Sequence, residues 1–292
     1  MNAGHPAAAT AYALATVLVW SSLAPLGVSV NHLPPFFITG CSLLVGGALA
    51  LPSLLRSGQW RIDAITLAIG IYGLFGYHVL LFTALQWAPP VAANLLNYLW
   101  PMGIVVLAPL FVRQLRFTWG HALAALLGFA GSAWVILDQA KDLQGLTQAQ
   151  AFWGYLSALA AAITWSTYSL MTKRRSHVPT PTIGAICLVC GALSLGVHAA
   201  VEPAVSINGR DAMVLFLLGL GPVGGAFYIW DKALKLGDAR QVGLWAFLTP
   251  VLSTALLSWQ SGQPLRLAIL GATTLIVVSA LVGRRAASAP VT

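Results

Sequence analysis

The sequence predicts an all-α polytopic membrane protein, and three observations lead to this fold class. Of the 292 residues, 58% are hydrophobic and only 8% are charged, whereas about a quarter of the residues in a soluble domain are charged. The apolar runs are about 20 residues long, the length that a helix needs to cross a bilayer. In lipid every backbone N–H and C=O must be paired within the protein, so runs of this length favour helices.

Ten such runs are present, and we therefore expect ten transmembrane helices. Short polar segments such as "NHLPP" and "SGQP" separate the runs. No cleavable signal is expected, because the first residues lack a basic segment and the first apolar run is long enough to span. The predicted helices cover residues 10–30, 36–55, 63–85, 90–112, 118–137, 151–171, 180–200, 211–231, 239–260 and 265–283.

The positions of lysine and arginine predict how these helices are oriented. With a cytoplasmic N-terminus, twelve of the fifteen basic residues lie on the cytoplasmic side, and only Lys141, Arg210 and Arg266 lie outside. An even number of helices places the C-terminus in the cytoplasm too. The net charge of +8 thus reflects topology and contact with membrane lipid. Nucleic acid is not an expected partner, because the basic residues are scattered over turns rather than gathered on one face.

The chain contains an internal duplication with an offset of 149 residues. "ALQWAPPVAANLLNYLWPM" (84–102) aligns without a gap with "ALKLGDARQVGLWAFLTPV" (233–251), so that Pro101 meets Pro250. Each copy holds five helices, and an odd number inserts the second copy upside down. Inverted repeats are typical of secondary transporters that bind substrate at the repeat interface. We expect a first repeat over 1–137, an extracytoplasmic linker over 138–150 and a second repeat over 151–292.

This doubled pattern resembles the EamA type of the drug/metabolite transporter superfamily over residues 10 to 285. The aromatic-rich segments "GYHVLLFTAL" and "NYLWP" are similar to those of family members that export aromatic amino acids from bacteria. The resemblance implies export of amino acids across the inner membrane. An alternative is export of other small metabolites or of organic cations such as methyl viologen. Gln114 and Gln263 stand where family members often have glutamate.

The segment "NLLNYLWP" carries polar and aromatic residues inside an apolar helix. Asn94, Asn97 and Pro101 recur at helical spacing and share one face, which Tyr98 and Trp100 flank. An amide in lipid is costly unless it faces a partner or water, so one interpretation is the wall of a substrate cavity. The other is that the asparagines join helices and that the proline only kinks its helix.

A histidine is the best-placed titratable group in the predicted hydrocarbon zone. His78 follows Tyr77 in the middle of the third helix, and no Asp, Glu, Lys or Arg lies deep in any predicted span. The imidazole could bind a substrate carboxylate or carry protons. It could also be a neutral ring that is hydrogen-bonded inside the bundle.

Three of the eleven tryptophans lie deep in predicted spans: Trp20, Trp100 and Trp165. Trp20 and Trp165 align as repeat mates, at a slightly different offset. An aromatic lining suits a flat ring by stacking and an ammonium group by cation–π attraction. The tryptophans at predicted helix ends are expected to form membrane-interface belts, and these are Trp60, Trp87, Trp119, Trp153 and Trp259.

The small residues predict architecture rather than chemistry. Pro101 and Pro250 are shared by both repeats, and Gly70, Gly73 and Gly76 are expected to let the third helix approach a neighbour closely. "GLGPVG" (219–224) matches a dinucleotide fingerprint but lacks the preceding strand. The three cysteines are expected to be packing residues, and they are Cys41, Cys187 and Cys190. No metal and no cofactor is expected.

These observations favour a secondary transporter that works by alternating access, and not an enzyme. No phosphate-binding loop is present that would use ATP. An intramembrane protease would need two buried aspartates or a serine within reach of His78, and the sequence offers neither pattern. A channel would need a charge ring or a backbone filter, which is not visible. The sequence does not predict an oligomeric state.

Overall fold

The structure is a computed structural model that describes residues 6–57, 61–88, 90–112, 115, 118–138, 148–260, 262 and 267–288. Within these ranges the chain consists of helices joined by turns and short connections, and no strand is found there. Most of the expected linker, residues 139–147, lies outside the described residues, as do the two glutamines at family glutamate positions and several loop residues discussed above: Gln114, Gln263, Trp60, Lys141 and Arg266.

The helices follow one another with short connections. In chain order they are α1 (Pro6–Ser21), α2 (Leu23–Ser29), α3 (Pro35–Ala48), α4 (Leu51–Ser57), α5 (Ala64–Gly70), the π-helical η1 (Ile71–Gly76), α6 (Tyr77–Trp87), α7 (Pro90–Asn97), α8 (Trp100–Phe111), α9 (Trp119–Asp138), α10 (Gln148–Arg174), α11 (Thr182–Val201), α12 (Gly209–Leu220), α13 (Gly225–Leu236), α14 (Ala239–Ala246), α15 (Leu248–Gln260) and α16 (Leu267–Ser288).

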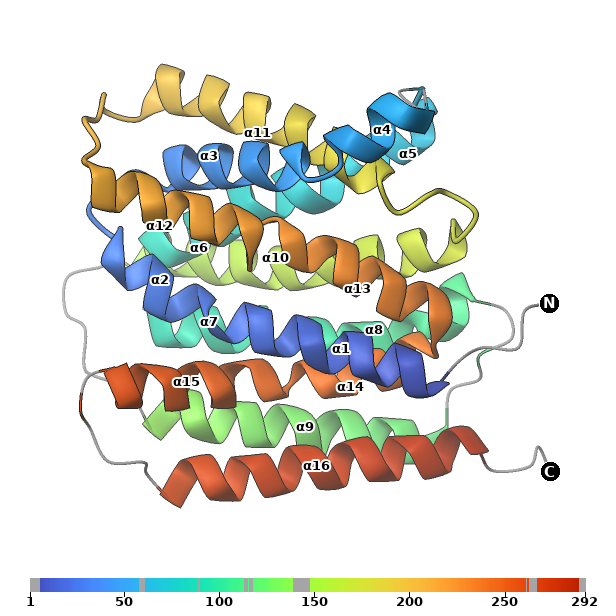
Figure 1. Ribbon diagram of the computed structural model, residues 1–292. Coiled ribbons are helices and arrows are strands. Elements are labelled where there is room, and N and C mark those ends of the chain that lie inside the picture. The colour runs from blue at the N-terminus through green and yellow to red at the C-terminus, as the bar shows by residue number, and fades with distance from the viewer. Residues whose placement is uncertain are drawn as a thin grey trace.

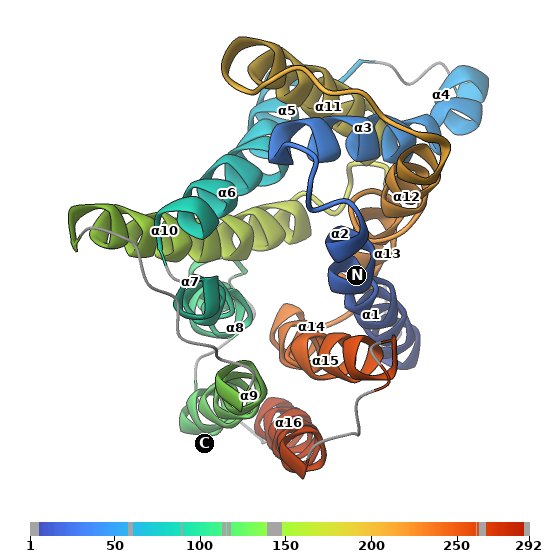
Figure 2. The same cartoon turned by 90° about the vertical axis from the view of Figure 1, so that its left-hand side faces the viewer.

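The helices lie side by side in one bundle, with their axes running across the view of Figure 1. The view in Figure 2 shows α9 and α16 together at one edge of the bundle, and α3 and α11 together at the opposite edge. Between these edges, α10 packs against α6 and α8, and α1 packs against α13, α14 and α15. Helices from the first and second halves of the chain therefore pack against each other between the two edges.

The composition and length of the helices agree with a membrane-spanning protein. Among the described residues, six helices are long and apolar enough to cross a bilayer, or seven if the pair α3 and α4, bent by 45°, forms one span. Many large apolar side chains on the outside of the bundle are exposed, among them Leu18, Leu110 and Leu270. Lipid is the solvent that such a surface fits.

Five of the predicted spans are each divided into two helices in the structure. A break separates α1 from α2, α3 from α4, α7 from α8, α12 from α13 and α14 from α15. Proline has no N–H and clashes with the carbonyl four residues before it, but the first turn of a helix tolerates it. Each break contains a proline or has one in the first turn of the helix that follows: Pro25, Pro52, Pro101, Pro222 and Pro250.

One end of the bundle, on the right in Figure 1, carries most of the described basic residues. At this end α1 begins, α4, α10, α13 and α16 end, and α14 begins. The last turns of four of these helices, and the first turn of α14, hold basic side chains, which include Arg56, Lys173, Arg174, Lys235, Arg240 and Arg285. Arg210 lies in the first turn of α12, which begins at the other end.

Candidate functional site

Four tryptophans meet in the middle of the bundle. Trp20 of α1 lies 5.9 Å from Trp100 of α8, 5.9 Å from Trp165 of α10 and 5.0 Å from Trp230 of α13, measured between ring centroids. Trp100 lies 6.4 Å from Trp165 and 5.6 Å from Trp230. All four are buried. The three tryptophans that the sequence places deep in spans are thus in mutual contact.

Three more rings surround Trp165. The centroid of Tyr77 lies 5.0 Å from that of Trp165, Tyr168 lies at 5.3 Å and Phe227 at 5.6 Å. We call these seven residues the ring cluster: Trp20, Tyr77, Trp100, Trp165, Tyr168, Phe227 and Trp230. Their tilted and edge-to-face pairs are the arrangements that aromatic rings prefer. The cluster therefore presents both ring faces and ring edges within a small volume.

Two hydroxyl groups hold the cluster to its helices. The Ser166 hydroxyl, next to Trp165, lies within hydrogen-bond distance of two carbonyls, that of Ala162 in its own helix at 2.6 Å and that of Trp100 in α8 at 2.8 Å, and it shares its one proton between them. The Trp230 indole N–H donates to the hydroxyl of Ser169 at 3.2 Å. Buried indole N–H groups usually find a partner in this way.

Sequence reasoning missed Trp230 because it ended the eighth helix at residue 231. The structure continues α13 to Leu236, so Trp230 lies well inside the helix. Its spacing of three from Phe227 places both rings on one face, and this signal could have identified it. The same extension places Asp231 inside α13, five residues before the end of the helix and not deep in the span. Asp231 is 5% exposed and forms an ion pair with Lys235.

Asn97 reaches the ring cluster and has an unused acceptor. It lies at the end of α7, is 5% exposed, and donates from Nδ2 to the Tyr77 hydroxyl at 3.3 Å. Its Oδ1 atom is buried without a hydrogen-bond partner among the described residues. An unsatisfied buried acceptor costs about 1–3 kcal/mol, so it requires an explanation.

The other two polar residues of this segment are less directly connected. Asn94 and Tyr98 are partly exposed, and the backbone N–H of Tyr98 donates to the carbonyl of Asn94 at 2.9 Å. Tyr98 nevertheless lies close enough to Tyr77 of the ring cluster to interact with it electrostatically. Asn97 and Trp100 make the direct contacts of this segment with the cluster, through a hydrogen bond and through ring packing.

His78 lies beside the ring cluster and is buried. It follows the π-helical turn η1, and its Nδ1 donates to the carbonyl of Leu74 in its own helix. Its ring lies 5.2 Å from Tyr77 and 5.9 Å from Phe82. Single π-helical turns within helices occur frequently at functional sites. The bond to Leu74 leaves Nε2 as the second ring nitrogen for another partner.

The architectural residues behave in different ways. Pro101 lies in the first turn of α8 and Pro250 in that of α15, each directly after a break. A Cβ atom on Gly73 would lie 2.0 Å from the ring of Tyr168, so Gly73 does allow a close approach. For Gly76 the expected close approach is wrong, because a Cβ there would meet nothing nearer than 3.8 Å.

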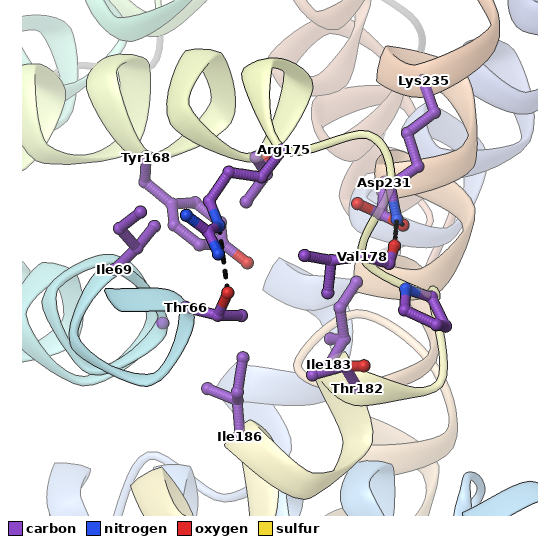
Figure 3. A pocket seen from close by; sticks show the side chains of 13 residues that line it. Thr66, Ile69, Tyr168, Arg175, Val178, Thr182, Ile183, Ile186, Asp231 and Lys235 are labelled. Atoms are coloured by element: carbon purple, nitrogen blue, oxygen red, sulfur yellow. Dashed lines mark hydrogen bonds and ion pairs between the residues drawn. The ribbon is translucent and has the colours of Figure 1, made fainter. Parts of the chain in front are cut away.

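A pocket that is open at its mouth adjoins the ring cluster at the basic end of the bundle. Figure 3 shows it between α5, α10, α11 and α13. Tyr168 lines the pocket and also contacts Trp165 of the ring cluster. The remaining lining residues include Thr66, Ile69, Thr172, Arg175, Val178, Ile183, Ile186, Asp231 and Lys235.

A helical bundle with six or seven membrane-spanning candidates, several of them built from broken helices, and with aromatic side chains gathered in its middle is consistent with a membrane transporter. The model of the EamA-like transporter family matches residues 8–137 and 152–283. The chain belongs to this family, and it is a multi-pass transporter of the bacterial inner membrane rather than an enzyme.

Three relatives show how far the similarity extends. The chain is 38% identical over 257 residues to the aromatic amino acid exporter YddG of Ancylobacter novellus, covering 85% of this chain and 87% of that protein. It is 26% identical to the aromatic amino acid exporter YddG of Escherichia coli, over 88% of this chain and 90% of that one. A solved crystal structure has a TM-score of 0.88 at 36% identity, and the match covers 97% of this chain and 99% of that chain.

Proposed function

We propose that the protein exports amino acids, aromatic ones included, and that the ring cluster with Asn97 and His78 holds the cargo. The observation that carries this proposal is the unpartnered Oδ1 of Asn97 beside the rings. A cargo ammonium group can donate to this oxygen and lie against ring faces, while a cargo ring stacks on the indoles. The names of the relatives at 38% and 26% identity agree with this cargo.

We further propose ten spans in two inverted five-helix repeats that rock around this site. The two ranges that the family model matches correspond to the two expected repeats. The helix breaks recur at the offset of 149 residues: the break between α7 and α8 lies at residues 98–99, and the break between α14 and α15 lies at residue 247. The π-helical turn at 71–76 likewise corresponds to the break at 221–224.

The proposed orientation places the basic end of the bundle in the cytoplasm. The start of α1 and the end of α16 lie at this end, so both termini would be cytoplasmic. Basic side chains at the ends of four helices support this orientation by the positive-inside rule. Cargo would enter at this end and leave at the end where α12 begins.

Counterflow in proteoliposomes tests the cargo and the site together. Vesicles are loaded with unlabelled phenylalanine, and entry of labelled phenylalanine is measured with and without excess methyl viologen. We expect Trp165→Ala to raise the half-saturating concentration by about 2-fold to 10-fold, the value of one lost stacking contact. Trp153→Ala is the matched control, because Trp153 lies on the same helix but is 54% exposed.

The outcome separates the two candidate cargo classes. Counterflow of phenylalanine that depends on Trp165 and not on Trp153 supports the proposal. Exchange of methyl viologen without exchange of phenylalanine would instead identify an exporter of organic cations. If Trp165→Ala and Trp153→Ala change counterflow equally, the ring cluster is not the cargo-binding site.

A further inference from the structure

The pocket between α5, α10, α11 and α13 has chemistry that the ring cluster lacks. We propose that it is a recruitment site, which binds the zwitterionic head group of an α-amino acid before the cargo reaches the ring cluster. This inference rests on the proposed function, since it takes amino acids as cargo and the basic end as the cytoplasmic end.

The acidic side of the pocket has a free acceptor. Oδ2 of Asp231 accepts from Lys235 and, at 2.6 Å, from the Thr180 hydroxyl, whereas Oδ1 accepts no hydrogen bond from any described residue. Figure 3 shows the Asp231 carboxylate between Lys235 and the interior of the pocket. The residue is 5% exposed, and a buried carboxylate attracts an ammonium group more strongly than one in water.

The cationic side of the pocket has free donors. Arg175 donates from Nε to the Thr66 hydroxyl at 3.0 Å and from Nη2 to both carboxylate oxygens of Asp63, at 2.8 and 2.9 Å. Its Nη1 donates to no described residue. A guanidinium with a free amino group can bind a carboxylate through charge-assisted hydrogen bonds. The carboxylate of a cargo amino acid is such a group, and Asp63 is exposed enough to be displaced.

The remaining walls suit the side chain of the cargo. Ile69, Ile183 and Ile186 supply apolar surface on two helices, and the Tyr168 ring closes the inner end. Tyr168 lies six residues before the end of α10, which corresponds to a depth of about 9 Å along the helix. Because the same ring contacts Trp165, the pocket and the ring cluster share one wall. Cargo that passes Tyr168 would enter the ring cluster directly.

The pocket and the ring cluster would recognise different parts of the cargo. The pocket offers an acceptor for an ammonium group and a donor for a carboxylate, so it favours a molecule that carries both. The ring cluster offers aromatic surface and one amide acceptor, so it binds the side chain and the ammonium group of the cargo. An organic cation without a carboxylate would satisfy only the acidic side of the pocket.

Protection from cysteine labelling tests occupancy of the pocket. Thr172→Cys lines the pocket, and Lys232→Cys is the control on α13, because Lys232 is exposed outside it. Both are labelled with a membrane-impermeant maleimide from the basic end, and the wild-type chain with its three cysteines gives the background. We expect phenylalanine to protect residue 172 but not residue 232, and 2-phenylethylamine, which lacks the carboxylate, to protect neither.

A second measurement identifies the group that holds the ammonium. In counterflow, Asp231→Asn should raise the half-saturating concentration of phenylalanine by about 10-fold to 100-fold, as expected for a lost charge-assisted hydrogen bond. Inhibition by 3-phenylpropionate, which has no ammonium group, should not change. The proposal is overturned if phenylalanine exchanges normally but does not protect residue 172 from labelling. It is also overturned if Asp231→Asn weakens the binding of phenylalanine and of 3-phenylpropionate equally. A wild-type protein that does not exchange phenylalanine overturns the proposed function itself.

Discussion

Replacing Gly73 by alanine tests whether the position of Tyr168 holds the ring cluster together. A Cβ atom at residue 73 would lie 2.0 Å from Cδ2 and 2.2 Å from Cγ of the Tyr168 ring. Carbon atoms in ordinary contact are about 3.5 Å apart, so the ring must retreat by roughly 1.5 Å. Tyr168 is buried and lies 5.3 Å from Trp165, so it cannot retreat without moving its neighbours.

The magnitude follows from two opposing effects. Overpacking a buried site costs about 1–3 kcal/mol. Alanine recovers about 0.5–1 kcal/mol relative to glycine inside a helix. We therefore expect Gly73→Ala to lower the free energy of unfolding by up to about 2.5 kcal/mol. Gly76→Ala is the matched control on the same helix, with its nearest neighbour at 3.8 Å, and should raise stability by about 0.5–1 kcal/mol.

The assay is the apparent melting temperature of the purified protein in detergent, together with phenylalanine counterflow. Gly73→Ala should melt below the wild type and transport more slowly, and Gly76→Ala should melt at or above it. If Gly73→Ala melts as high as Gly76→Ala, the ring of Tyr168 is free to move and does not fix the geometry of the ring cluster.

Two further predictions concern protons. The Thr66 hydroxyl and backbone N–H donate to Asp63, and these bonds, with Arg175 nearby, hold its pKa below the ordinary value of 3.8. A carboxyl whose pKa is lower in the folded state contributes stability above the ordinary pKa and loses it as the pH falls through the folded-state pKa. Thr66→Val should therefore lower the melting temperature near neutral pH and flatten its decline below about pH 4, and a decline of unchanged shape would contradict this. For His78→Gln, we expect downhill exchange to persist and any response to an imposed pH gradient to disappear, whereas equal responses of both proteins would exclude proton coupling through this imidazole.

Much of the ring cluster could be predicted from the sequence, because depth in a span is a local property. Trp20, Trp100 and Trp165 lie near the middle of long apolar runs, and Tyr77 and Asn97 lie on runs that the alignment pairs with the second repeat. The structure brings all five together. The family, the helical class and the membrane location are confirmed as well.

The rest depended on where helices end and how segments pack. Trp230 and Asp231 stand at the end of the predicted helix 211–231, whereas α13 continues to Leu236, and Lys235 pairs with Asp231 one turn further on. The recruitment pocket combines α5, α10, α11 and α13 with the segment that follows Arg174, and no periodicity within one helix predicts such a meeting. The helix breaks could have been inferred from the prolines, since each lies beside one.

The mutual contacts of the four tryptophans affect how much free energy it costs to open the ring cluster for a substrate. In the structure these indoles pack against one another, with ring centroids 5.0 to 6.4 Å apart. If the ring cluster holds the cargo as proposed, an aromatic side chain can take over the contacts that it separates, so opening the cluster loses little contact energy. A substrate with an aliphatic side chain would not replace the ring contacts that it separates. Its head group alone would then have to compensate for the lost contact energy.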